Sequence, residues 1–93
     1  GLCFDYVAPG TFKDQQRGYF RYQLSWGGPS DEFRFYCDEG FRPVRIEYWF
    51  LDWFDGAHLV LTGRNEALLR EIFYEFFKEA GSVESEYEKA MES

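Results

Sequence analysis

Residues 65–81, NEALLREIFYEFFKEAG, decide the fold. Asn65 can accept the free backbone N–H groups of a first helical turn, and Glu66 suits the positive end of the helix dipole. Gly81 ends the segment with a residue that adopts the left-handed conformation without strain. Apolar residues recur at helical spacing in one stripe, which comprises Leu68, Leu69, Ile72, Phe73, Phe76, Phe77 and Ala80. The pattern predicts an amphipathic helix over residues 65–80 that packs on a sheet through this stripe.

The sheet is predicted from the residues that precede this helix. Four segments have strand patterns, namely residues 18–26, 32–37, 44–54 and 59–62. Gly, Pro and Asp residues between them indicate short turns, as expected for antiparallel neighbours. We therefore expect an α+β fold in which a four-stranded antiparallel β-meander, residues 18–62, packs on one helix.

The flanking segments complete a single domain over residues 1–93. Residues 82–92 carry apolar side chains at helical spacing among several Glu, and they predict a short acidic helix. Residues 1–17 form an N-terminal segment in which residues 2–7 allow an extra edge strand.

The composition favours a soluble protein of a reducing compartment. Aromatic residues make up 23% of the 93 residues, so rings can build a stable core without disulfides or metals. Cys3 and Cys37 lack the spacing of a zinc or redox site, and no apolar run has the length of a membrane helix. We expect a cytoplasmic location and no cofactor.

Negative charge is concentrated in the C-terminal third of the chain. The formal net charge is -7, and residues 66–93 contain eight Glu against three Lys or Arg. This charge disfavours direct binding to nucleic acids or membranes and favours a basic protein partner. Glu71, Glu75 and Glu79 lie at i, i+4 and i+8 on the polar helix face, so they are the first candidates for partner contact. A solvated helix face explains the same spacing.

A second apolar face of the predicted sheet needs a cover. Trp49, Leu51 and Trp53 lie two residues apart, so they share one face of the predicted sheet. This face is opposite to the one that a single helix can bury. The N-terminal segment, the last helix or another protein would have to cover them, because large exposed apolar patches are rare on monomers. Contact with a partner through these residues is one hypothesis, and a homodimer joined through Trp49 and Trp53 is another.

Asp52, Asp55 and His58 form the best candidate for a metal site. Two carboxylates and an imidazole this close in sequence can hold a divalent ion, which gives an alternative function as a metal-dependent hydrolase or nuclease-like domain. Turn chemistry explains Asp55, and a solvated loop explains His58. Because the chain has a single His and no marked pairing of a nucleophile with a base, we expect no catalytic residue and no enzymatic activity.

Arginine and tyrosine alternate along two of the predicted strands and just before the first of them, at Arg17, Tyr19, Arg21, Arg34 and Tyr36. Such a pattern can form a patch that stacks on nucleic-acid bases. The acidic balance favours a different interpretation, in which the arginines form cross-strand ion pairs with Asp31, Glu32 and Glu47.

The stretches YFRYQLSWGGPSDEFRFY (19–36) and RIEYWFLDWFDGA (45–57) resemble segments of small proteins carried by phages, plasmids and conjugative elements. Size, acidity and aromatic content are also similar to those of anti-CRISPR proteins, which bind Cas proteins and often occupy their nucleic-acid sites. The resemblance brings no catalytic motif. It implies a non-enzymatic inhibitor in a bacterial host, which blocks a basic nucleoprotein such as a CRISPR effector with an acidic and aromatic surface.

Overall fold

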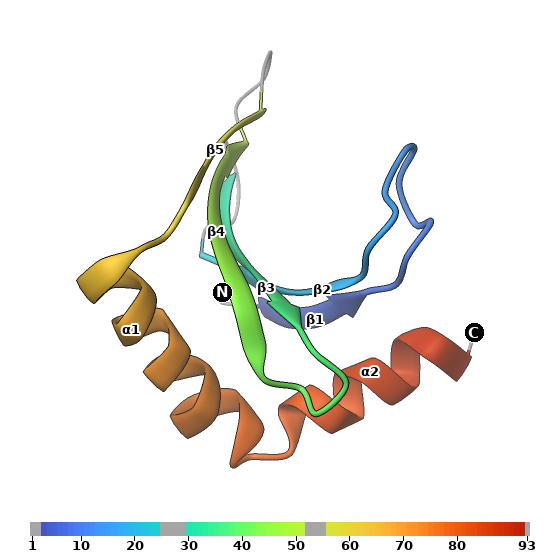
Figure 1. Ribbon diagram of the computed structural model, residues 1–93. Coiled ribbons are helices and arrows are strands. Elements are labelled where there is room, and N and C mark those ends of the chain that lie inside the picture. Colours follow the sequence, from blue (N-terminus) through green and yellow to red (C-terminus); the bar gives the residue numbers. More distant parts are fainter. Residues whose placement is uncertain (1–2, 25–29, 52–55, 93) are drawn as a thin grey trace.

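The computed structural model describes residues 3–24, 30–51 and 56–92, which form an α+β fold (Figure 1). One antiparallel sheet has the strand order β1-β2-β3-β4-β5, with bounds Cys3–Val7, Tyr19–Gln23, Ser30–Cys37, Pro43–Leu51 and Gly56–Val60. The helical segments that follow are α1 (Gly63–Ile72), the π-helix η1 (Phe73–Lys78) and α2 (Ser82–Glu92). The α+β class is confirmed, whereas the expected number of four strands is wrong by one.

The fifth strand comes from the N-terminal segment. β1 pairs with β2 over its whole length, from Cys3 opposite Gln23 to Val7 opposite Tyr19. Residues 8–18 then lead back into β2, and a Cβ at position 18 would collide with the hydroxyl of Tyr6. Gly18 therefore allows the chain to pass close to this side chain.

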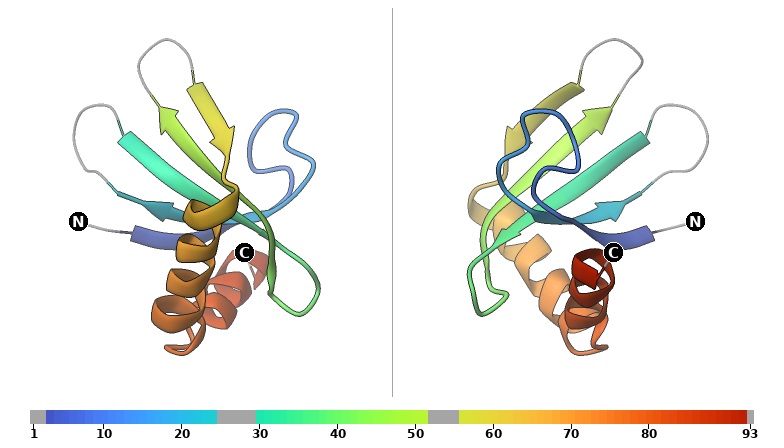
Figure 2. Two further views of the ribbon diagram at one scale, coloured as in Figure 1. Left: turned by 60° about the vertical axis from the view of Figure 1, so that its left-hand side comes forward. Right: turned by 90° about the vertical axis from the view of Figure 1, so that its right-hand side faces the viewer.

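All helical segments lie on the same side of the sheet, as both views of Figure 2 show. We call this side the helix face and the opposite side the open face. The helix face buries a core of rings around Phe73, which is fully buried. The Phe73 ring lies 4.9–6.2 Å, centroid to centroid, from the rings of Phe4, Phe20 and Phe35. Strands and helices are therefore joined mainly by aromatic packing.

The first helix differs from the prediction at its start and in its second half. Thr62 is the N-cap residue and the helix begins at Gly63, so Asn65 lies inside the first turn and is not the cap. From Phe73 onwards the helix is a π-helix, which ends with a bond from the Glu79 N–H to the Tyr74 carbonyl, five residues earlier.

The predicted apolar stripe is only partly buried. Leu68 and Phe76 are 53% and 65% exposed, and Ala80 is exposed as well. In the second half of the helix, the wider π-turns place Tyr74 and Phe77 against the core, while Phe76 stays outside. A uniform period of 3.6 residues puts Phe76 on the buried side, which is why the prediction was wrong here.

β4 contains an irregularity next to its first residue. Pairing with β3 changes from Arg45 opposite Tyr36 to Pro43 opposite Cys37, so Val44 has no partner across the ladder. Val44 is 54% exposed and does not join Ile46 in the core, although strict alternation over residues 44–54 would place both side chains on the same face. A bulge of this kind bends a strand and increases its twist.

The short C-terminal helix is confirmed as α2. Gly81, at φ +78°, separates it from the preceding helix, and Val83 anchors it in the core with no exposed surface. None of the helices in the described part of the chain has both the length and the apolar character that crossing a bilayer requires.

Candidate functional site

The open face carries charged and aromatic side chains in place of an apolar layer. Register and alternation bring nine of them together, from four strands: Asp5, Tyr19, Arg21, Glu32, Arg34, Tyr36, Arg45, Glu47 and Trp49. Two arginines, Arg21 and Arg34, are direct neighbours across β2 and β3. Like charges in such positions destabilise a sheet unless carboxylates compensate them.

Each of these two arginines has a carboxylate partner. Arg21 donates two hydrogen bonds to Asp5, with N–O distances of 2.7 and 3.0 Å. Arg34 Nε donates to Glu32 Oε2 at 2.6 Å, and Glu32 is only 1% exposed. A carboxylate this deeply buried requires a charged partner, and Arg34 provides it.

A third ion pair stands on β4 and includes the second buried carboxylate. Arg45 Nε donates to Glu47 Oε2 at 2.6 Å, and Trp49 Nε1 donates to Glu47 Oε1 at 2.8 Å. Burial alone would raise the pKa of Glu47, but the bonds from Trp49 and Arg45 outweigh it and hold this pKa below its usual range. Burial, followed by the nearby Glu47 charge, raises the pKa of Tyr36.

Trp49 is the centre of a stacked column. The Arg34 guanidinium lies 3.9 Å from one ring centroid of Trp49 and 4.6 Å from the Tyr19 centroid. His58 stacks on Trp49 at 4.2 Å with an interplanar angle of 9°. The chain therefore covers Trp49 largely with its own polar side chains, and all described helices lie on the other face of the sheet.

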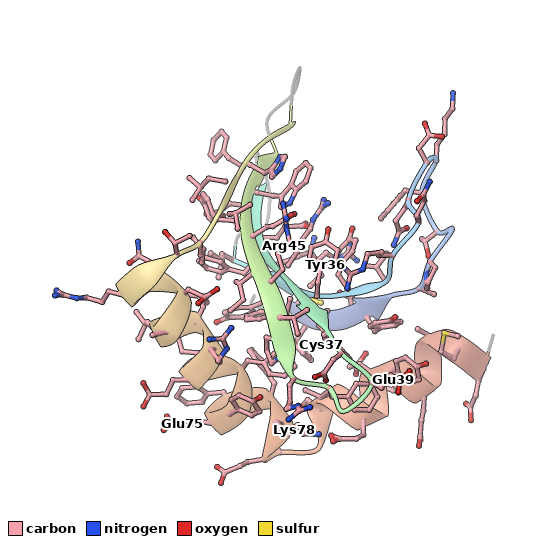
Figure 3. All side chains as sticks on the ribbon, viewed as in Figure 1. Tyr36, Cys37, Glu39, Arg45, Glu75 and Lys78 are labelled. Atoms are coloured by element: carbon pink, nitrogen blue, oxygen red, sulfur yellow. The ribbon has the colours of Figure 1, made fainter. Side chains whose placement is uncertain are left out.

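A groove of about 650 Å³ lies on the open face, with residues 12–17 as one wall. Its floor comes from the three middle strands, through Tyr19, Tyr36, Arg34 and Arg45 among others. Figure 3 shows Tyr36 and Arg45 on this side of the sheet, and Glu75 outside the helices on the other side.

Comparisons with protein-family models, with curated proteins and with solved structures find no match to this chain. The site is therefore interpreted from its own chemistry.

The predicted contact residues lie on opposite sides of the sheet. Glu71, Glu75 and Glu79 are exposed along the first helix and just after it, whereas Trp49 belongs to the groove. The backbone of Leu51 pairs with Ser30 and Gly56, and its side chain lies outside what is described. Trp53 lies outside the described residues.

The candidate metal site is not brought together in the described part of the chain. His58 stacks on Trp49, while Asp52 and Asp55 lie outside the described residues. Among residues 3–24, 30–51 and 56–92, no three His, Cys, Asp or Glu side chains converge in a way that could hold a metal ion.

The arginine and tyrosine pattern forms ion pairs, and Glu32 is a predicted partner, although its pair with Arg34 lies within one strand and not across two strands. Arg21 pairs with Asp5 of β1, and Arg34 pairs with Glu32 on its own strand. Arg17 has no carboxylate partner among the described residues and lies 5.5 Å from the Tyr36 ring. The groove wall that includes Phe12 and Lys13 has no periodic signal, so the sequence predicts it only as part of an N-terminal segment.

Proposed function

We propose that this chain is a non-enzymatic binding protein that inhibits a basic, nucleic-acid-binding partner through the acidic surface of its first helix. One observation carries the proposal: Glu71, Glu75 and Glu79 are exposed and have no ion-pair partner among the described residues. Three other glutamates of the helices are compensated locally, in the pairs Glu66–Arg70, Glu84–Lys78 and Glu86–Lys89.

Exposed apolar side chains accompany the three free carboxylates. Phe76 follows Glu75 directly and is 65% exposed, and Leu68 is 53% exposed one turn before Glu71. We call the surface formed by Leu68, Glu71, Glu75, Phe76 and Glu79 the acidic ridge. An exposed aromatic ring within a charged rim is typical of the centre of a protein interface. We therefore propose Phe76, and not Trp49, as the aromatic residue that contacts the partner.

A nucleic-acid-binding protein is the class of partner that fits this ridge. Such proteins line their grooves with Lys and Arg that neutralise phosphates. Glu71 lies in α1, Glu75 in the π-helix η1 and Glu79 directly after it, so the three carboxylates follow one another along the helical segment and can compete as a group for such a groove. A CRISPR effector is the first partner to test, because of the resemblance to anti-CRISPR proteins.

The test compares two triple charge reversals that change the net charge equally. E71K/E75K/E79K reverses the acidic ridge, whereas E39K/E88K/E92K reverses three other exposed glutamates without ion-pair partners among the described residues. We would measure DNA cleavage by a panel of CRISPR effectors, and binding to any effector that is inhibited, at low salt and at about 0.5 M salt.

The proposal predicts that the unmodified chain inhibits at least one effector and binds it more weakly at high salt. The ridge reversal should weaken binding by about 100-fold, or about 2.7 kcal/mol, and the control reversal by less than about threefold. Equal losses of affinity in both variants would mean that only the net charge matters, and they would contradict specific binding through the acidic ridge. Inhibition of no effector in the panel would contradict the assignment to this partner class.

A further inference from the structure

We propose that the groove on the open face binds a small anionic ligand that carries a planar ring, such as a nucleoside monophosphate. This proposal does not depend on the acidic ridge, which lies on the other side of the sheet. The groove volume of about 650 Å³ is within the range of small-molecule sites, which is roughly 300–1,000 Å³.

The groove is a basic region in an acidic protein. Its lining contains four cationic residues, Lys13, Arg17, Arg34 and Arg45, against the carboxylates of Asp14 and Glu47. The chain as a whole has a formal charge of -7. The local charge of the groove thus has the opposite sign from the rest of the surface, which favours an anion at this place.

Two of the cations are available to a ligand. Arg34 is occupied by Glu32 and lies between two rings, and Arg45 is paired with Glu47. Lys13 and Arg17 are exposed and have no carboxylate partner among the described residues. A phosphate or carboxylate in the groove would pair with Lys13 and Arg17, at the wall formed by residues 12–17. The Arg45 side chain is 48% exposed, so its remaining N–H groups can add a further bond.

The same wall offers an aromatic surface. Phe12 is 50% exposed and lines the groove directly beside Lys13. No ring contact involves Phe12 within the described residues, whereas both faces of Trp49 are covered by Arg34 and His58. A planar ring would therefore pack on Phe12, beside the Arg17 side chain that lies 5.5 Å from the Tyr36 ring, and would not stack on Trp49. Covering an exposed aromatic side chain gives the ligand apolar contact area in addition to the ion pairs.

The charge distribution favours a small ligand over a long polyanion. The molecule measures 35 × 34 × 26 Å, and charges are screened over about 8 Å at physiological salt. A ligand confined to the groove is therefore affected mainly by the local cations. A nucleic-acid strand that continued past the groove would meet a surface whose total charge is strongly negative.

The experiment follows the ¹H–¹⁵N NMR spectrum of the full chain during titration with three probes. Adenosine provides the ring, inorganic phosphate provides the anion, and AMP provides both. We expect AMP to shift the amide signals of residues 12–17, Tyr36 and Arg45, with a Kd about tenfold or more below that of either separate probe. No shifts at about 10 mM AMP, or shifts that are centred on the helices, would overturn the proposal.

Variants of the loop identify the contacts. K13Q/R17Q should weaken AMP binding by about tenfold or more, whereas R64Q/K89Q, which removes two exposed cations outside the groove, should leave it within about twofold. F12S should weaken AMP while phosphate binding stays unchanged. Equal binding of AMP by K13Q/R17Q and the unmodified chain would overturn the proposal. So would tighter binding of a ten-nucleotide DNA strand than of AMP, because it would identify an extended nucleic-acid surface.

Discussion

Both faces of the sheet bury side chains, but they do so by different chemistry. On the helix face, Phe20 is 1% exposed and packs among rings; on the open face, Glu32 is also 1% exposed and is held by Arg34. The helices fill the first face with apolar contacts from outside the sheet. The second face is filled by side chains of the sheet itself, through ion pairs and stacking of arginine on aromatic rings. A chain of 93 residues can thus close both faces of a sheet with one helical layer.

The largest loss of stability is expected from the centre of the helix face. Phe73 is fully buried and contacts rings from three strands, so F73A should lower the free energy of unfolding by about 3–5 kcal/mol. Urea unfolding followed by circular dichroism measures this change. A loss below about 1 kcal/mol would mean that the helices are not anchored through this ring.

A loss of about 2–4 kcal/mol is expected when Arg34 on the open face is replaced by Met, because Glu32 would remain buried without its partner. R34M/E32L, which removes both charges, should recover much of this loss. The matched control is R42M, whose ion pair with Asp38 is largely exposed and should contribute far less than the Arg34 pair. If R34M and R42M had the same small effect, the open face would not contain a buried ion pair.

These two faces differ in how far the sequence predicts them. Apolar periodicity gave the α+β class, the position of α2 and most strand segments, because burial against a flat sheet imposes a period on the chain. β1 was an open alternative because five residues with a central Asp5 are a weak strand signal. Asp5 is accommodated in the sheet by its ion pair with Arg21, a residue that is distant in sequence. The sequence predicted that the arginines pair with Glu32, but it did not predict that this pair lies within one strand or that Glu32 is buried.

The sequence also could not predict which side chains of the first helix are buried in its second half. Phe76 and Phe77 are both apolar, and a regular α-helix accommodates both in the same stripe. Which ring is buried depends on the π-turns, and these are stabilised by the packing of Phe77 against Phe4, at 4.0 Å with parallel rings. The groove depends in turn on a loop that is held by short-range hydrogen bonds, such as those between Thr11 and Ala8 and between Gly10 and Gln15, and these bonds have no periodic signal in the sequence.

The smallest loss of stability is expected from Phe76, the exposed ring of the pair Phe76 and Phe77. F76A should change the free energy of unfolding by less than about 0.5 kcal/mol, because Phe76 is 65% exposed. F77A should cost about 2–3 kcal/mol through the loss of its stacking on Phe4. Thermal and urea unfolding of the two variants compare them directly. Equal destabilisation would indicate a regular α-helix with both rings in the stripe.

The indole N–H signal of Trp49 tests most directly whether the open face is closed by its own ion pairs. The signal, assigned with W49F, is followed by NMR as the pH is lowered. Because Glu47 accepts this N–H and its pKa lies below the ordinary value of 4.5, the signal should stay protected from exchange and shift only below pH 4.5. The stabilisation that ionised Glu47 provides is likewise present above pH 4.5 and lost as the pH falls through its lowered pKa. Rapid exchange with water at neutral pH, or a shift centred at or above pH 4.5, would contradict the account.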